Sequence, residues 1–199
     1  DRSRGLGDVY KRQGMVGPSD ICIAEGSMGL FDGVISKGAG GNGSTADLAS
    51  ITNWPVILVV DCAKQAQSVA ALIAGFNSFR HDITIGGIIL NNISSKRHEA
   101  LVVSEVSKTK VPILGVIPRS NELTIPERHL GLVQAEDLSD LEQLIFKLGT
   151  LIEENCDLEA IACTARKSSP AIPTLQKITP PAQRIAIARD NACLLYTSD

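Results

Sequence analysis

Short apolar segments alternate with amphipathic ones along most of this chain. Four apolar segments are rich in β-branched residues and too short for helices: DICIAEG (Asp20–Gly26), PVILVVD (Pro55–Asp61), ITIGGIILNN (Ile83–Asn92) and VPILGVIPR (Val111–Arg119). A fifth, RIAIARD, spans Arg184–Asp190. Continuous apolar strands of this kind are usually buried on both faces, as in a parallel sheet. The pattern therefore predicts strands at these five places.

Helical patterns lie between the predicted strands. They cover Ser44–Thr52, which opens at a Gly-Ser-Thr cap, then Ala66–Phe79, Lys96–Ser107 and Asp137–Glu154. Strands that alternate with helices indicate a layered α/β fold with right-handed crossovers. We assign residues 14–164 to this domain. The stretch after it, 165–183, carries four prolines and no period, so we expect an interdomain linker there.

The two ends show no period of either kind. Residues 1–13 (DRSRGLGDVYKRQ) and 193–199 (CLLYTSD) resemble translated adapter sequence found at the ends of short-read assemblies. We expect both to be artefacts and leave them out of the fold prediction; disordered native arms are the alternative. On this interpretation the native chain extends in both directions. RIAIARD, within 184–192, would then begin a second domain.

Composition excludes several classes of function. Aromatic residues make up 4% of the chain and the formal net charge is −3, which speaks against a base-stacking or strongly basic surface for nucleic acid. No apolar run is long enough for a membrane helix, so we expect no membrane partner. The five cysteines form no CxxC pair. That favours free thiols in the cytoplasm over disulfides or a zinc site.

Polar groups follow the predicted strands where each strand ends. In an open parallel sheet, ligands bind beyond these carboxyl ends. The residues placed there are Glu25, Asp61, Asn91, Asn92 and Arg119 after Pro118. One such residue is commonly a cap or a turn former, but four strands in succession favour a binding site.

The loop EGSMGLFDG (Glu25–Gly33) is the strongest candidate site. A carboxylate followed at once by glycine can reach a hard cation while the backbone approaches a phosphate. Asp32 lies seven residues after Glu25 and precedes a glycine. The two carboxylates could therefore hold Mg²⁺ or orient a substrate through it. An ordinary Asp-Gly turn is the alternative for Asp32.

Further along, GAGGNGSTADLAS places Ser44 and Thr45 at a helix start. Bare N–H groups and hydroxyls there suit an anion, although a plain N-cap explains them equally well. The sequence contains no GxxxxGK[ST] motif, so a phosphate-binding P-loop would lie outside it. PERHLGL (Pro126–Leu132) reads either as a surface helix start or as a ligand loop.

Taken in order, these motifs resemble the cobyrinate a,c-diamide synthase family. The resemblance runs from Pro18 to Asn191 through EGSMGLFDG, GSTADLA, PVILVVDCA, GGIILNNISSKRH, PILGVIPR, IPERHLGLV and RIAIARD. It implies a three-layer parallel sheet of the P-loop NTPase or dethiobiotin synthetase-like type. The first strand of a class I glutamine amidotransferase domain would follow.

The family's activity would be ATP- and glutamine-dependent amidation of the a- and c-acetate carboxylates of a cobyrinate or hydrogenobyrinate corrinoid, in cobalamin biosynthesis. The resemblance implies ATP and Mg²⁺ as cofactors and a phosphorylated carboxylate as intermediate. It leaves a homodimer open. Because the P-loop and glutaminase residues lie outside this sequence, we expect the chain alone to be inactive.

The resemblance also assigns roles to single residues. Glu25 resembles the carboxylate on the Mg²⁺ and phosphate side, and Asp32 resembles the group that positions or activates the substrate carboxylate. Asp61 either holds the metal through water or simply ends its strand. Ser44 and Thr45 resemble substrate-side groups. The expected adenine pocket involves Asn91, Pro118 and Arg119.

Three other readings compete with this one. The first is a partitioning or regulatory ATPase of the same P-loop group, against which the proline-rich stretch followed by RIAIARD counts. The second is a cobyric acid synthase or dethiobiotin synthetase-like ligase, which matches EGSMGLFDG and PERHLGL less well. The third is a pseudogene product with no role.

Overall fold

The structure, a computed structural model, describes residues 21–36, 38, 40–120 and 141–166 of the 199-residue chain. The chain divides into two compact units. The first comprises residues 1–119 and 151–172, and the second comprises residues 120–150 and 173–199. All elements considered below belong to the first unit, apart from residues 141–150 of helix α5. Within the described residues, no helix is both long and apolar enough to cross a bilayer.

Three parallel strands form the sheet, in the order β1-β2-β3. They are β1 (Val56–Asp61), β2 (Ile85–Ile93) and β3 (Ile113–Pro118). These strands confirm three of the apolar segments predicted from the sequence. The register pairs Asp61 with Asn91 and Ile93 with Pro118, so the polar groups after the strands share one edge.

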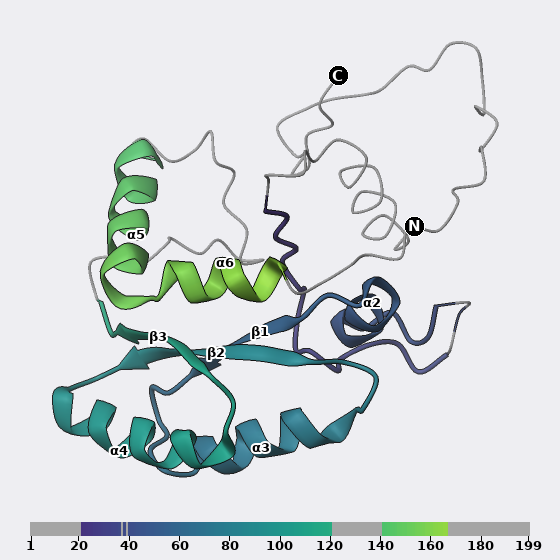
Figure 1. The fold of residues 1–199 in the computed structure, drawn as a ribbon, viewed down its shortest axis with the longest axis horizontal. Helices are drawn as coiled ribbons and strands as arrows, with labels where there is room; N and C mark the ends of the chain where they lie inside the picture. Colours follow the sequence, from purple (N-terminus) through teal and green to yellow (C-terminus); the bar gives the residue numbers. More distant parts are fainter. Residues whose placement is uncertain (1–20, 37, 39, 121–140, 167–199) are drawn as a thin grey trace. The chain divides into compact units, whose positions relative to one another are not determined.

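Helices cover both faces of this sheet, as the α/β prediction requires. Helices α3 and α4 lie on one face and α6 lies on the other (Figure 1). The core lies between the sheet and helices α3 and α4. It consists mainly of β-branched and leucine side chains: Ile73, Val69, Val102, Val106, Ile88 and Leu90. The helix bounds are α2 Thr45–Thr52, α3 Val69–Phe79, α4 Lys96–Val106, the 3-10 turn η1 Ser107–Thr109, α5 Leu141–Asn155 and α6 Leu158–Arg166.

Glycines let the α6 segment approach the sheet closely. A Cβ on Gly86 of β2 would lie 2.5 Å from Cγ2 of Thr164, and one on Gly115 of β3 would collide with Sγ of Cys156. The N–H of Asp157 donates to the carbonyl of Leu114 (2.8 Å), which fixes the start of α6 against β3. The face of β2 and β3 opposite α3 and α4 is therefore covered by the α6 segment, whose side chains pack directly on the glycine backbone of these strands.

Strand β1 is less well covered. It lies at an edge of the described sheet, and α6 contacts β2 and β3. Val59, in the middle of β1, is 59% exposed, although its neighbour Val60 is 4% exposed. One face of β1 thus joins the core while the other remains open among the described residues.

The predicted first strand is wrong over its described part. Residues 21–26 form an irregular loop, and Ile21 and Ile23 are 50% and 83% exposed. A strand needs a neighbour that completes its ladder of hydrogen bonds. None of the three described strands pairs with this segment, so its apolar composition alone does not make it a strand. Glu25 consequently lies in a loop and not at a strand end.

The region after β3 contains one helix that the sequence predicted and one that it did not. The helix expected over 137–154 is present as α5 from Leu141 onward, while 137–140 lie outside the described residues. Helix α6 was not predicted. Its signal was Asp157, whose carboxylate accepts from the N–H of Ala160 (2.8 Å) as an N-cap. Residues 167–199, with most of the expected linker and RIAIARD, lie outside the described part.

Candidate functional site

The loop Glu25–Gly33, called the glycine loop below, is anchored by two apolar residues. Leu30 is 6% exposed and its carbonyl accepts from the N–H of Ala46 in α2 (2.9 Å). The ring of Phe31 packs on two rings of α3, with centroids 5.3 Å from Phe76 and 4.7 Å from Phe79. Backbone and apolar contacts therefore hold this loop, and they leave its carboxylates outside the core.

Asp32 closes a tight turn within the glycine loop. Its N–H donates to the carbonyl of Gly29 (3.0 Å), and its Oδ2 accepts from the N–H of Gly29 (3.0 Å). A Cβ on Gly29 would lie 2.5 Å from the same carboxylate oxygen, so a larger residue there would displace the Asp32 side chain from this bond. Asp32 thus ends a turn that spans Gly29–Asp32, whereas the alternative predicted from the sequence was a turn formed by Asp32 and Gly33. Because the carboxylate remains exposed, the turn also presents it to solvent.

Glu25 lies beside the start of α2. A Cβ on the next residue, Gly26, would lie 2.7 Å from Cγ2 of Thr45, so only glycine lets the loop pass so close to this helix. The side chain of Glu25 is exposed. The structure therefore brings the residue that follows Glu25 against the predicted substrate-side residue Thr45.

Ser44 caps α2, as its sequence position suggested. Its hydroxyl accepts from the N–H of Asp47 (3.2 Å), and the carboxylate of Asp47 accepts from the N–H of Ser44 (3.3 Å), which completes a capping box. Ser44 is 4% exposed. Its hydroxyl thus has a structural partner, and among the two predicted substrate-side residues Thr45 is the more accessible.

Asp47 connects this cap to the end of α3. Besides the capping bonds, its carboxylate accepts from the N–H of Asn42 (2.8 Å) and from the guanidinium of Arg80 (2.7 Å), which also pairs with Asp82. Burial alone would raise the pKa of Asp47, but the bonds from Arg80, Ser44 and Asn42 outweigh it and lower that pKa. This network fixes the glycine-rich segment before α2.

A second group of polar residues, Asp61, Asn91 and Asn92, is called the asparagine edge below. Oδ1 of Asp61 accepts from Nδ2 of Asn92 (2.9 Å) and from the N–H of Ala63 (3.0 Å). Asn92 has a left-handed backbone (φ 60°), and its N–H donates to Oδ1 of Asn91 (2.9 Å). The bond from Asn92, then that from Ala63, lowers the pKa of Asp61, so its carboxylate is ionised at neutral pH.

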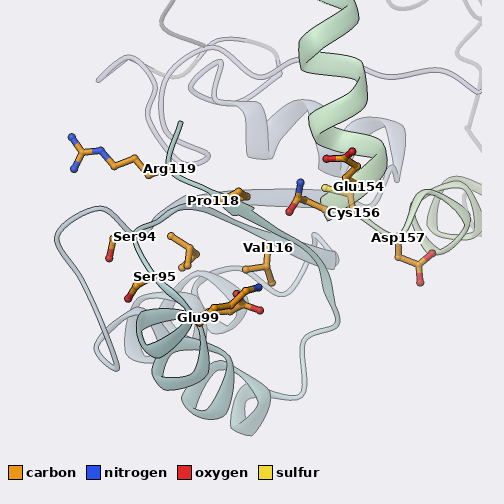
Figure 2. Close-up of a pocket in the computed structure, with 12 residues that line it drawn as sticks. Ser94, Ser95, Glu99, Val116, Pro118, Arg119, Glu154, Cys156 and Asp157 are labelled. Carbon is orange, nitrogen blue, oxygen red and sulfur yellow. The ribbon is translucent and has the colours of Figure 1, made fainter. Parts of the chain in front are cut away.

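A cavity of about 680 Å³ opens beside the ends of β2 and β3 (Figure 2). Pro118 and Arg119 line it, and so do Ser94 and Ser95 of the loop after β2 and Lys96 at the start of α4. Residues 154–157 line it as well. In Figure 2 the side chain of Arg119 extends away from the other lining residues. Asn91 does not line this cavity. The three residues predicted to form the adenine pocket are therefore divided. Pro118 and Arg119 line the cavity, whereas Asn91 pairs with Asp61 of β1.

The described residues can contribute to a magnesium site but do not form one by themselves. No group of three metal-binding side chains occurs among them. Magnesium is often held by one or two carboxylates with waters and substrate phosphates. Asp61 suits this chemistry because both of its bonds use Oδ1, which leaves Oδ2 for water or metal.

Sequence reasoning missed the structural partners within the site. Asn92, and not the predicted Asn91, donates to the carboxylate of Asp61. The ring of His98 links two loops. The KRH motif at a helix start was the only signal for His98. PERHLGL lies in residues 121–140, outside the described part, so its two readings stay open.

A family model described as an AAA domain matches residues 19–127. No solved structure matches the chain. The matched range includes the glycine loop, the asparagine edge and all three strands.

Several curated relatives carry one name, hydrogenobyrinate a,c-diamide synthase. The protein of Brucella anthropi is 45% identical over 174 residues, which are 86% of this chain and 39% of that protein. The protein of Rhodobacter capsulatus is 41% identical over 184 residues, 92% of this chain and 42% of its own length. The protein of Streptomyces coelicolor is 45% identical over 150 residues, which are 75% of this chain and 30% of that protein. The chain thus spans about two fifths of the length of the first of these relatives.

Proposed function

Because the chain belongs to the AAA domain family, we propose that it contributes the ATP-dependent part of a corrinoid a,c-diamide synthase. The observation that carries this proposal is the 41–45% identity to proteins named hydrogenobyrinate a,c-diamide synthase over most of the chain. The exposed carboxylates of the glycine loop support it. The reaction belongs to cobalamin biosynthesis, and we place it in the cytoplasm, where ATP and glutamine are available.

The proposed reaction has two chemical steps. First, an acetate carboxylate oxygen of the corrinoid attacks the γ-phosphorus of ATP; an O–P bond forms, the bond to ADP breaks and an acyl phosphate results. Ammonia released from glutamine then attacks the acyl carbon; a C–N bond forms, the C–O bond breaks, phosphate leaves and the nitrogen loses a proton. Glutamine hydrolysis would take place in a separate amidotransferase domain.

The residues of this chain would serve the first step. Asp32, fixed in its turn with Gly29, would position the substrate carboxylate, and Thr45, with Ser44 behind it, would contact the substrate. Glu25 and Asp61 would hold Mg²⁺, which supplies charge neutralisation where two anions meet.

The nucleotide would lie at the ends of β2 and β3. A side-chain amide both donates and accepts, as adenine requires, which suits Asn91 to the base. Pro118 and Arg119 would border the base from the cavity side. The relatives' names favour hydrogenobyrinate over cobyrinate as the corrinoid. A homodimer would be compatible with this arrangement.

A partitioning or regulatory ATPase is the main rival function. It shares the type of domain, but it would hydrolyse ATP without consuming glutamine or a corrinoid. The two functions therefore differ in a measurable requirement for co-substrates.

The test uses a full-length protein that carries this sequence, incubated with ATP, glutamine and hydrogenobyrinate or cobyrinate. We expect ADP and diamide to form in a ratio of two to one, with activity dependent on all three substrates. Asp32→Asn keeps the turn with Gly29 but removes the charge, so amidation should fall at least about a hundredfold while ATP affinity stays within about twofold. ATP hydrolysis that is indifferent to the corrinoid would support the rival instead.

A further inference from the structure

His98 of α4 joins two loops at the carboxyl edge of the sheet. Its Nε2 lies 2.6 Å from the carbonyl oxygen of Gln65, in the loop after β1. Its Nδ1 accepts from the N–H of Ser94, in the loop after β2, and lies 3.1 Å from the Ser94 hydroxyl as well. The ends of β1 and β2 beside these loops are linked by the bond from Asn92 to Asp61 and by the bond from the N–H of Cys62 to the carbonyl of Asn91 (2.9 Å).

These partners determine the protonation of the imidazole ring. A backbone N–H can only donate, so Nδ1 must be the unprotonated nitrogen that accepts from Ser94. A carbonyl can only accept, so Nε2 must carry the proton that it donates to Gln65. The neutral Nε2–H tautomer satisfies both partners at once, and neither the other tautomer nor the imidazolium does.

The backbone of His98 is fixed as well. Ser95 is the N-cap of α4, and its hydroxyl accepts from the N–H of His98 (3.2 Å). The ring is therefore presented from the first turn of a capped helix. Both partner loops lead directly to the proposed nucleotide site: the loop of Gln65 begins at Asp61, and Ser94 lines the cavity that Pro118 borders.

We infer that His98 is a positioning residue, which sets the nucleotide side of the site by holding the loops after β1 and β2 at a fixed separation. This inference rests on the proposed function, because it assumes that ATP occupies the asparagine edge and the neighbouring cavity. His98 itself contacts no reacting atom in this role. Its effect passes through the backbone of Ser94 and Gln65.

The inference predicts a selective effect on ATP. In the full-length protein, His98→Ala removes both bonds and should weaken ATP binding about tenfold, while corrinoid binding changes less than about twofold. Both dissociation constants are measured by calorimetry, so the result does not depend on turnover. His81→Ala, at an exposed histidine between α3 and β2, is the matched control and should leave both constants unchanged.

Two isosteric variants separate the bonds from the volume of the ring. His98→Asn places an acceptor near the position of Nδ1, and His98→Gln places a donor near that of Nε2. Each should recover about half of the lost binding free energy, leaving ATP affinity about threefold weaker than in the unchanged protein. These variants also carry the test if His98→Ala fails to fold. If neither variant binds ATP more tightly than His98→Ala does, the positioning role of His98 is wrong. If His98→Ala does not fold and neither variant binds ATP, the role is wrong as well.

Nitrogen NMR of the His98 ring gives an independent readout. We expect a protonated Nε2 and an unprotonated Nδ1 at neutral pH; the opposite tautomer would overturn the inference. Unchanged ATP affinity in His98→Ala, or an equal loss for ATP and corrinoid, would also overturn it. Failure of the proposed function looks different: the unchanged protein would bind ATP but form no diamide, or would bind no ATP at all, and the second result would remove the inference with it.

Discussion

The glycine loop and the asparagine edge are stabilised in opposite ways. In the glycine loop, Leu30 and Phe31 hold the segment through apolar packing, and the carboxylates of Glu25 and Asp32 remain exposed. At the asparagine edge the polar side chains bond to one another, as Asn92 does to Asp61. The first arrangement leaves charge free to meet a ligand, whereas the second fixes donors and acceptors before a ligand arrives. Substitutions of polar residues in the glycine loop should therefore change the rate of amidation. Substitutions at the asparagine edge should change both the stability of the protein and its binding of ligand.

Replacing Glu25 should give the largest effect. Glu25→Gln removes an exposed charge without touching the packing of Leu30 or Phe31, so we expect amidation by the full-length protein to fall about a thousandfold, which is roughly 4 kcal/mol. Steady-state kinetics measure the loss. The thermal midpoint should not change, and Glu142→Gln at an exposed position of α5 should be silent. A large drop in stability with Glu25→Gln would contradict the contrast between the two regions.

Removing the apolar anchor should destabilise the protein. Leu30→Ala deletes a side chain that is 6% exposed, so we expect a loss of about 3 kcal/mol in the free energy of unfolding. Urea denaturation measures it. Ile35→Ala, a few residues on at a fully exposed position, should change that free energy by less than about 0.5 kcal/mol. Similar losses for both variants would show that the loop is not held through Leu30.

At the asparagine edge, two substitutions of Asn92 separate backbone from side chain. Asn92→Ala loses the bond to Asp61 and forces alanine into a left-handed backbone, for a cost of about 2 kcal/mol. Asn92→Gly loses only the bond, for about 1 kcal/mol. Denaturation ranks the two variants, and NMR titration should show the pKa of Asp61 rising in both. An unchanged Asp61 pKa would mean that the bond from Asn92 is not formed in solution.

The cap at Asp47 should give the smallest effect, and one that depends on pH. Asp47→Asn weakens the pairing with Arg80 and should cost about 1 kcal/mol at pH 7. Because the pKa of Asp47 is lowered in the folded state, the unfolded chain takes up this proton first as pH falls. The difference in the free energy of unfolding between variant and parent therefore has its full size well above pH 3.8, and it shrinks as the pH falls below that value. A difference that grows in acid would reverse the assigned direction of the pKa.

The sequence predicted those features that depend on local pattern. The three strands, the helices α2 to α5 and the cap at Ser44 follow from apolar periodicity and from residue type at helix starts. The segment Ile21–Gly26 has the same apolar character but no strand beside it in the described structure, and composition does not reveal a missing neighbour. Helix α6 was missed although the shorter α2 was predicted, because a Gly-Ser-Thr cap marked the start of α2, whereas the cap at Asp157 was not recognised in the sequence.

Contacts between distant residues could not be read from the sequence. The ring of His98 bonds to Gln65, which is 33 residues away, and the amide of Asn92 bonds to Asp61, which is 31 residues away. Both pairs form only because the parallel register brings the ends of β1 and β2 side by side. Sequence reasoning placed the polar groups on the correct edge but could not say which would bond to which.

The open face of β1 has a consequence for handling the protein. Val59 stands exposed in a strand whose edge is unpaired among the described residues. Such a strand can recruit the same strand of another molecule, so the described part of the sheet is open to association at this edge. A charged side chain at that position, as in Val59→Lys, would repel a second copy while leaving Val60 and the core in place.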